Sequence, residues 1–262
     1  MKKKETINHI VKWLKEYCEE SGMKGFVVGV SGGIDSALTS TLCALTGKKT
    51  ILLNMPILQH KAQFDLAEEH IIWLKKKFKK VSSYEINLSD TFLQLKKNLP
   101  AEIQDEHAMA NTRSRLRMLT LYLVSTHNKM LVAGTGNKIE DFGVGFFTKY
   151  GDGGVDLSPI ADLMKSEVYA LAKELGVSEA IVNAPPVDGL WADNRTDEQQ
   201  IGASYDEMEW AMKNLSLKSQ VSSLKLNSRQ KKVLEIYKRL NKINAHKMKP
   251  VPVCIIPEKL KK

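Results

Sequence analysis

The residues best suited to chemistry begin with a stretch at 29–36, which reads Gly-Val-Ser-Gly-Gly-Ile-Asp-Ser and overlaps the end of the apolar run Phe26–Val30. Backbone N–H groups at a helix start, beside glycines, form an anion-binding site. Ser31 and Ser36 can add hydroxyl donors, and Asp35 can hold Mg²⁺ against phosphate oxygens. No Gly-Lys-Ser/Thr follows, so this is not a Walker A loop. The stretch predicts a site for a magnesium-bound polyphosphate.

Two later stretches carry further polar residues. Residues 134–140 read Gly-Thr-Gly-Asn-Lys-Ile-Glu and end in the carboxylate of Glu140. Residues 145–159 read Gly-Phe-Phe-Thr-Lys-Tyr-Gly-Asp-Gly-Gly-Val-Asp-Leu-Ser-Pro. A loop of this length inside a compact domain is usually functional or disordered, and its aromatic residues argue against disorder. We therefore expect this loop to serve a function.

Alternating strands and helices must position these stretches. Apolar, β-branched runs predict buried strands at Phe26–Val30 and Thr50–Asn54, and two further strands are predicted at Ser83–Ile86 and Met130–Ala133. Helical spacing of apolar residues fills the segments between them, which predicts a doubly wound, mainly parallel α/β sheet with helices on both faces. Ligands of such sheets gather at the carboxyl ends of strands, where residues 29–36 and 134–140 both lie.

The long helix predicted at 109–127 carries Arg115. We expect Leu119 and Leu123 to lie on its core-facing side, because their spacing is helical. The last helix is predicted to end before an extended tail that begins at about residue 245.

The composition suits one globular domain spanning residues 1–262, with 43% hydrophobic residues. The net charge is +9, and much of it lies in lysine runs at 2–4, 75–80 and 259–262. These runs predict a solvated helix face and charged termini, so no nucleic-acid partner is expected. The basic balance also suits polyanionic small substrates.

The cellular setting is predicted from what the sequence lacks. Cys18, Cys43 and Cys254 are scattered and form no Cys-x-x-Cys motif, which suits a reducing cytoplasm. The N-terminus has no apolar signal region and the chain has no long apolar span, so no membrane is expected.

The combination of motifs, more than any one of them, resembles the NAD synthetases, a family of N-type ATP pyrophosphatases. The shared motifs occur in the family's order, at residues 31–36, 134–140, 145–159, 196–198 and 246–247. The resemblance runs from about Phe26 to Pro252, and the block at 145–159 is its most specific part. Only about 25 residues precede the first strand, too few for the amidase domain of glutamine-dependent relatives, so the chain resembles the ammonia-dependent form.

The resemblance implies a fold like that of the adenine nucleotide alpha hydrolases, a homodimer, and a two-step reaction. The carboxylate of nicotinic acid adenine dinucleotide (deamido-NAD) attacks the α-phosphorus of ATP, and pyrophosphate leaves. Ammonia then attacks the acyl adenylate to give NAD and AMP. Because two polyanions must meet, Mg²⁺ and lysines are expected to offset their repulsion.

The resemblance also implies residue roles. The expected ATP-binding residues are Gly29, Val30, Ser31, Gly32, Gly33, Ile34, Asp35, Ser36, Thr135, Lys165 and Val187. The expected metal ligands are Asp35 and Glu140. The expected deamido-NAD contacts are Arg115, Lys149, Asp156, His246 and Lys247, and the catalytic candidates are Lys165 and Asp152, the latter for deprotonating ammonium. Val187 departs from the pattern, since many relatives have Thr or Ser at this position.

Other interpretations stay open at this point. Asp35 and Ser36 suit an ordinary helix start, Lys165 a surface position, and Asp152 and Asp156 simple turns. Another ATP pyrophosphatase, such as a tRNA-modifying adenylating enzyme, fits the basic charge, although no zinc motif, thiol-transfer cysteine pair or RNA module is recognisable. A non-catalytic ATP-binding module would leave the metal-binding carboxylates and the 145–159 loop unexplained.

Overall fold

A four-stranded parallel sheet lies at the centre of the computed structural model, which describes residues 1–187, 189–191, 195–216 and 226–261. The strands are β1 (Gly25–Gly29), β2 (Lys49–Asn54), β3 (Val81–Glu85) and β4 (Leu131–Val132). Their order is β3-β2-β1-β4, with every neighbouring pair parallel. Strands β2 and β3 extend the sheet on one side of β1 and β4 lies on the other, so the predicted doubly wound fold is confirmed.

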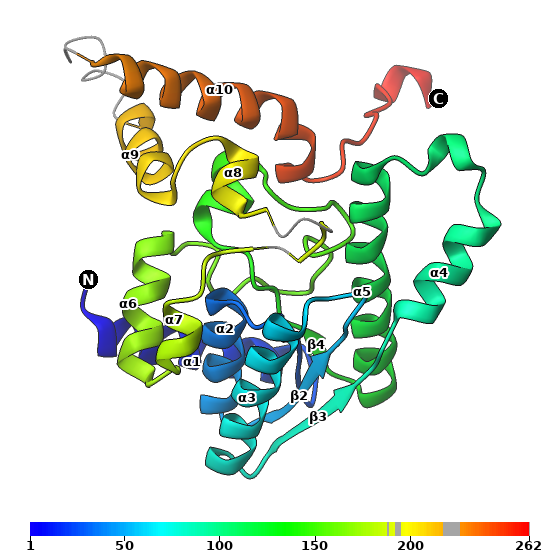
Figure 1. Ribbon diagram of the computed structural model, residues 1–262, viewed down its shortest axis with the longest axis vertical. Coiled ribbons are helices and arrows are strands. Elements are labelled where there is room, and N and C mark those ends of the chain that lie inside the picture. The colour runs from blue at the N-terminus through cyan, green and yellow to red at the C-terminus, as the bar shows by residue number, and fades with distance from the viewer. Residues whose placement is uncertain (188, 192–194, 217–225, 262) are drawn as a thin grey trace.

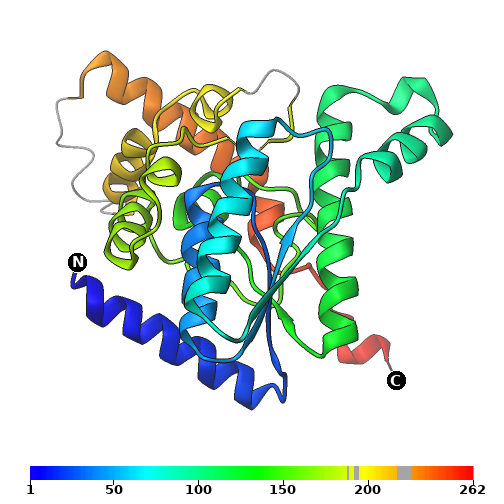
Figure 2. The ribbon, with the colours of Figure 1, turned by 60° about the horizontal axis from the view of Figure 1, so that its bottom comes forward.

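Helices cover both faces of this sheet (Figure 1, Figure 2). One face packs against α1 (Lys3–Glu20), α2 (Ile34–Leu45), α3 (Lys61–Lys77), α6 (Lys165–Leu175) and the short α7 (Glu179–Val182). The other packs against α4 (Ser89–Asn98) and α5 (Glu106–Asn128), which are joined through the 3-10 turn η1 (Ala101–Ile103). Successive residues of β1 alternate between the two cores: Phe26 and Val28 belong to the first, and Val27 belongs to the second. Burial on both faces explains why β1 and the middle of β2 are apolar, whereas the edge strand β3 is polar and largely unburied.

A third group of helices lies beyond the carboxyl ends of the strands (Figure 1). It contains the π-helix η2 (Ile139–Val144), α8 (Asp197–Ile201), α9 (Tyr205–Ser216) and α10 (Ser228–Met248). These elements share a separate hydrophobic cluster that includes Ile139, Met208 and Tyr237. The chain ends in the short turn η4 (Glu258–Leu260). The carboxyl-end edge of the sheet is thus covered by elements with their own small hydrophobic core.

Two expectations about helices are wrong. Leu119 and Leu123 were expected to face the core, but they are 61% and 68% exposed on the outer side of α5. The same helix meets the sheet through residues such as Met109 and Val124. Helical spacing shows that apolar residues share a face, but it does not show which face has a neighbour.

The predicted extended tail begins later than expected. Helix α10 continues to Met248, so its last turn contains His246 and Lys247. Asn241 and Asn244 donate hydrogen bonds to the carbonyl oxygens of Gly143 and Val144, at 2.7 and 2.8 Å. These tertiary contacts hold the end of α10 against η2. Within the described residues, no helix has the length and apolarity needed to span a membrane.

Candidate active site

A cavity of about 600 Å³ lies where β1 and β4 end. Its walls come from the 29–36 loop, the start of η2, the 145–155 loop, α5 and the last turn of α10. Thirteen of the predicted site residues line it, namely Gly29, Val30, Ser31, Asp35, Ser36, Arg115, Thr135, Glu140, Lys149, Asp152, Val187, His246 and Lys247. The three stretches singled out from the sequence therefore meet at one place.

The 29–36 loop closes on itself through serine hydroxyls. The hydroxyl of Ser36 donates to the carbonyl of Gly33 at 2.9 Å and accepts from the backbone N–H of Ser31 at 3.2 Å. The two serine oxygens are also 3.2 Å apart. The loop is therefore shaped before any ligand arrives, and it leads into the N-terminus of α2, where the helix dipole favours an anion.

The glycines and Ile34 of this loop serve its packing. Gly32 has φ +87°, and a Cβ there would lie 2.5 Å from the carbonyl oxygen of Gln63 on α3. Gly33 caps α2, and Ile34 is buried in the core. Gly32, Gly33 and Ile34 are not among the described residues that line the cavity. Their predicted contact with ATP stays a prediction.

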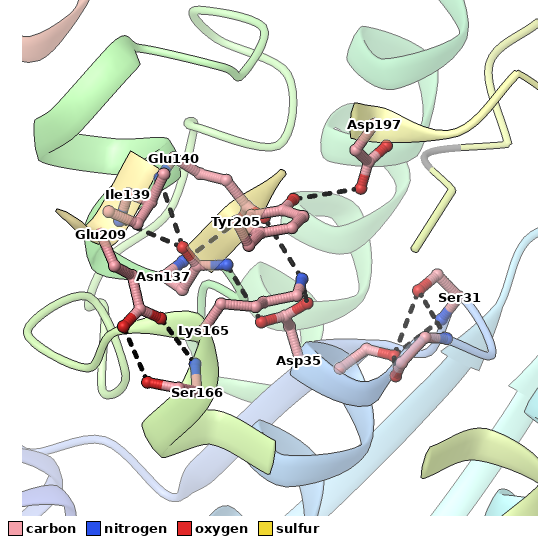
Figure 3. A network of polar contacts seen from close by, with 12 residues as sticks. Ser31, Asp35, Asn137, Ile139, Glu140, Lys165, Ser166, Asp197, Tyr205 and Glu209 are labelled. Atoms are coloured by element: carbon pink, nitrogen blue, oxygen red, sulfur yellow. Dashed lines mark hydrogen bonds and ion pairs between the residues drawn. The ribbon is translucent and has the colours of Figure 1, made fainter. Parts of the chain in front are cut away.

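Asp35, Glu140 and Lys165 form a buried charged cluster (Figure 3): the two carboxylates line the cavity, and Lys165, behind them, is not among the described residues that line it. The Lys165 Nζ lies 2.6 Å from Asp35 Oδ2 and 3.4 Å from Glu140 Oε1. The side chains are 3%, 18% and 15% exposed for Lys165, Asp35 and Glu140. Lys165 is the first residue of α6, where the helix dipole disfavours a cation. The two carboxylates must offset both that effect and the cost of burial.

The pKa values in this cluster depend on burial and on the charges of the neighbouring members. Burial alone would lower the pKa of Lys165, but the negative charges of Asp35 and Glu140 outweigh it and raise that pKa. Burial raises the pKa of Glu140, the charge of Lys165 lowers it, and the charge of Asp35 raises it. The lysine is therefore held as an ammonium ion between two carboxyl groups.

Asn137 contacts both carboxylates, because its backbone N–H also donates to Glu140 Oε2 at 3.4 Å. Its side-chain N–H donates to Asp35 Oδ1 at 3.2 Å, and its carbonyl oxygen accepts from the backbone N–H groups of Ile139 and Glu140 at 3.1 and 3.3 Å. Gly136 is needed beside it, because a Cβ there would lie 2.2 Å from a carboxylate oxygen of Asp141. Gly136 and Asn137 of the 134–140 motif thus each have a structural role beside the two carboxylates.

The donor set of this cluster fits a divalent cation. Asp35 and Glu140 both contact one positive charge, the Lys165 ammonium, which shows that the two carboxylates lie close enough together to share a cation. Carboxylate oxygens are hard ligands that suit Mg²⁺. Within the described residues, no group of three or more His, Cys, Asp or Glu side chains could hold a metal ion. Two carboxylates plus phosphate and water oxygens are the usual Mg²⁺ environment, and these two match it.

Basic side chains form the opposite wall of the cavity. Lys149 Nζ donates to the His246 carbonyl at 2.9 Å, and Lys247 Nζ donates to the Phe147 carbonyl at 2.7 Å. The Arg115 guanidinium donates to the Lys149 carbonyl at 3.4 Å. These bonds to neutral carbonyls hold the side chains without neutralising them, so the wall keeps its positive charge for a ligand.

Asp152 lies between the basic wall and α5. Its Oδ1 accepts hydrogen bonds from the Ser114 hydroxyl at 2.6 Å and from the Thr148 backbone N–H at 3.0 Å. Burial around the carboxyl group raises its pKa, against the lowering effect of these bonds and of the Lys247 charge. A carboxylate with a raised pKa is a stronger base than an ordinary one.

Asp156 lies away from the cavity lining among the described residues. Its Oδ1 accepts from the Tyr122 hydroxyl at 3.0 Å, and its Oδ2 accepts from the Val132 backbone N–H at 2.8 Å. These bonds tie the 145–159 loop to β4 and α5. A contact between Asp156 and the dinucleotide stays a prediction.

Tyr205 and Asp197 were missed from the sequence. The Tyr205 hydroxyl lies 2.6 Å from Glu140 Oε1 and 3.2 Å from Asp197 Oδ2 (Figure 3). Asp197 belongs to the Thr-Asp-Glu stretch at 196–198, which opens α8 and was recognised as a shared motif without a role for the aspartate. Tyr205 lies 65 positions from Glu140 and carries no spacing signal, so only the tertiary structure places it in the cluster.

Comparison with known proteins agrees with this geometry. Residues 6–251 match the family model described as NAD synthase. The chain is 36% identical to an NH(3)-dependent NAD(+) synthetase of Alkaliphilus metalliredigens, over 94% of this chain and 97% of that protein. It is 38% identical to the protein of the same name from Mesoplasma florum, over 80% and 84% of the two chains.

Solved structures with a similar fold include two close in size to this chain. An NMN synthetase from Francisella tularensis superposes with a TM-score of 0.81 at 30% identity, covering 98% of this chain and 99% of that one. An NH3-dependent NAD synthetase from Campylobacter jejuni superposes with a TM-score of 0.79 at 28% identity, covering 97% and 100%.

Proposed function

This chain belongs to the NAD synthase family, and from that premise we propose which of its residues perform each part of the reaction. The reaction is the ATP-dependent amidation of deamido-NAD by ammonia, which gives NAD, AMP and pyrophosphate. The supporting observation is that an anion-binding loop, two carboxylates sharing one cation and a basic wall all border one cavity. Two polyanions repel each other, so this cavity must supply the positive charge that brings them together.

The 29–36 loop and the charged cluster are assigned to ATP. The backbone N–H groups at the start of α2 and the hydroxyls of Ser31 and Ser36 bind phosphate oxygens. Asp35 and Glu140 hold Mg²⁺, and Lys165 contacts the phosphates from behind. When bound, Mg²⁺ neutralises the charge that develops on the leaving pyrophosphate. Thr135 and Val187 also line the cavity and are assigned to ATP.

The basic wall is assigned to the dinucleotide. Arg115, Lys149, His246 and Lys247 hold its phosphates and place the nicotinate carboxylate toward the α-phosphorus of ATP. Positioning of this kind supplies much of the rate enhancement in a reaction between two bound substrates. Asp156 supports the loop that carries Lys149, and a direct contact with the dinucleotide is part of the same proposal.

Asp152 is assigned to the ammonia step. Ammonium must lose a proton before its nitrogen can attack the acyl carbon, and a carboxylate of raised pKa can accept that proton. The hydrogen bonds from Ser114 and Thr148 both go to Oδ1 and hold the carboxyl group in place, and we assign Oδ2 to accept the proton.

We expect the purified chain, given ATP, Mg²⁺, ammonium and deamido-NAD, to form NAD, AMP and pyrophosphate in equal amounts. The products follow from the proposed reaction, in which the nicotinate carboxylate attacks the α-phosphorus of ATP and not the γ-phosphorus. Chromatographic quantification of all nucleotides measures the ratio, and omission of ammonium is the control. Release of ADP and phosphate would contradict the assignment.

The likeness to the NMN synthetase of Francisella tularensis favours a second candidate substrate, a mononucleotide. Replacing deamido-NAD by nicotinic acid mononucleotide in the same assay separates the two. We expect a higher kcat/KM with the dinucleotide, in line with the names of the curated relatives. The opposite preference would reassign the substrate but leave the ATP chemistry unchanged.

The outer side of α5 is assigned to a homodimer interface near the dinucleotide. Leu119 and Leu123 are exposed there, and Arg115 lies on the same helical face, four residues before Leu119, while also lining the cavity. The nearby tail exposes Val251, Val253 and Ile255. Contiguous exposed apolar residues on a globular protein mark an interaction surface.

Sedimentation velocity is expected to show a dimer at assay concentration. Replacing Leu119 and Leu123 together by serine should shift the protein toward monomer, because the interface loses its apolar centre. Ile72→Ser is the matched control, since Ile72 is a half-exposed isoleucine on α3, which packs on the opposite face of the sheet. A fully active wild-type monomer would remove this part of the proposal.

We also assign the chain to the cytoplasm. Cys18 and Cys43 are free and buried and Cys254 is free and exposed, as suits a reducing compartment.

A further inference from the structure

Tyr205 touches two of the three charged members of the cluster of Asp35, Glu140 and Lys165. It is the first residue of α9 and is 5% exposed. Its hydroxyl lies 2.6 Å from Glu140 Oε1, and the Lys165 Nζ lies 4.4 Å from the centre of its ring. The phenol therefore covers the side of the cluster that faces the α9–α10 core (Figure 3).

The hydroxyl has one proton and two carboxylate neighbours. The distance to Asp197 Oδ2 is 3.2 Å, longer than the distance to Glu140. A phenol can donate its proton fully to only one acceptor, and the shorter contact assigns it to Glu140. This bond is the shortest one to the Glu140 carboxylate: Lys165 Nζ lies 3.4 Å from the same oxygen, and the Asn137 backbone N–H donates to Oε2 at 3.4 Å.

The second neighbour connects the hydroxyl to the ATP side of the cavity. The backbone N–H of Asp197 donates to the carbonyl of Pro186 at 3.0 Å, and the next residue, Val187, lines the cavity. A short series of contacts therefore leads from the segment at Val187, through Asp197 and Tyr205, to Glu140.

Packing alone does not account for the hydroxyl. The ring belongs to the cluster of Ile139, Met208 and Tyr237, where a phenylalanine ring would fill nearly the same volume. A buried hydroxyl costs free energy unless it is hydrogen-bonded, and this one is bonded to a group assigned to metal binding. Groups that hydrogen-bond a metal ligand orient it and set its affinity.

We propose that Tyr205 is a positioning residue that holds the Glu140 carboxylate toward Asp35 for the magnesium ion of the ATP complex. The proposal rests on the assignment of Asp35 and Glu140 as metal ligands. Tyr205 itself contacts neither nucleotide nor metal in this scheme; it acts through Glu140.

Tyr205→Phe tests the role of the hydroxyl, because it keeps the ring over Lys165. Tyr237→Phe is the matched control: Tyr237 is also a buried tyrosine, 7% exposed, in the same hydrophobic cluster, and its hydroxyl has no hydrogen bond to the described residues. The probe is Mn²⁺ binding in the presence of α,β-methylene-ATP, measured by titration calorimetry. We expect the Kd for Mn²⁺ to rise about 10- to 100-fold in Tyr205→Phe and to stay at the wild-type value in Tyr237→Phe.

Steady-state kinetics adds a second readout that packing would not affect. The KM for Mg²⁺ should rise in Tyr205→Phe by a similar factor, while kcat at saturating Mg²⁺ recovers toward the wild-type value. The thermal midpoints of the two variants should be alike. A Tyr205→Phe protein that loses its fold while Tyr237→Phe keeps it would overturn the proposal, because the hydroxyl would then be structural.

Comparing Asp35→Asn with Tyr205→Phe separates the role of Tyr205 from the assignment of Asp35 and Glu140 as metal ligands. If Asp35→Asn binds Mn²⁺ as tightly as the wild type does, the metal assignment itself is wrong. If Asp35→Asn loses the ion but Tyr205→Phe retains wild-type affinity, the metal assignment stands and the role of Tyr205 is refuted.

Discussion

Asp35→Asn is expected to lower kcat by about 100- to 1,000-fold, because a metal ion contributes several kcal/mol to stabilising the transition state. The substitution keeps the shape of the side chain and removes one of the two charges that converge on Lys165. Glu140→Gln is expected to have an effect of similar size. Both carboxylates face the same cation, so each is needed for the same step.

The double variant should be little worse than either single variant, since groups that act through one ion do not contribute additively. The test is a double-mutant cycle: kcat of the two single variants and the double variant is measured at saturating Mg²⁺, with circular dichroism to confirm that each is folded. Asp162→Asn is the matched control, because Asp162 also pairs with a lysine, Lys138, at 2.7 Å but is exposed. Additive losses would mean that the carboxylates do separate jobs, and a near-normal single variant would remove that residue from the metal site.

Lys165→Met is expected to reduce both activity and stability. Its ammonium is the positive charge between Asp35 and Glu140, and removing one member of a buried ion pair costs about 3–5 kcal/mol of unfolding free energy. Lys138→Met is the control for a lysine in an exposed pair. Urea unfolding of both variants, without metal, measures the difference.

The stability of Lys165→Met should also depend on pH in a direction fixed by Glu140. Burial already raises the pKa of Glu140, and loss of the lysine charge raises it further. Above the unfolded pKa of about 4.3, the folded variant then binds more protons than the unfolded chain, so its stability falls as pH rises. The loss relative to wild type should be smaller at pH 5 than at pH 8, and Mg²⁺ with ATP should restore part of it. An equal loss at both pH values would contradict this account.

The sequence was sufficient for the parts of the fold that depend on local pattern. The apolar run at Phe26–Val30 and the glycines after it predict a buried strand followed by a helix start, and both are confirmed. The sequence could not show why residue 32 must be a glycine, because the requirement comes from α3, which packs close to the loop at this position. A local sequence pattern indicates which backbone conformations a segment can adopt, but it does not identify the neighbouring element that requires one of them.

The candidate site was predictable where its residues lie in compact motifs, and not where a distant element completes it. Glu140 and Lys149 lie in the motifs at 134–140 and 145–159, and both line the cavity. Tyr205 joins the cluster only because α9 folds back over η2. The prediction that Leu119 and Leu123 face the core was wrong for a related reason. An apolar helix face can pack against the core or against a partner, and the sequence does not distinguish the two.

The charged cluster joins parts of the chain that a ribosome makes at different times. Asp35 and Lys165 are 130 positions apart, so at about 5–20 residues per second the aspartate waits roughly 7–26 s for its lysine. During that interval β1 and α2 are already made, but a carboxylate without a cation has to stay in water. We therefore expect the nascent chain to leave this edge of the sheet open until α6 and α9 emerge. The charged cluster is then among the last parts of the protein to assemble, and a chain that stops before Tyr205 lacks the hydroxyl that bonds Glu140.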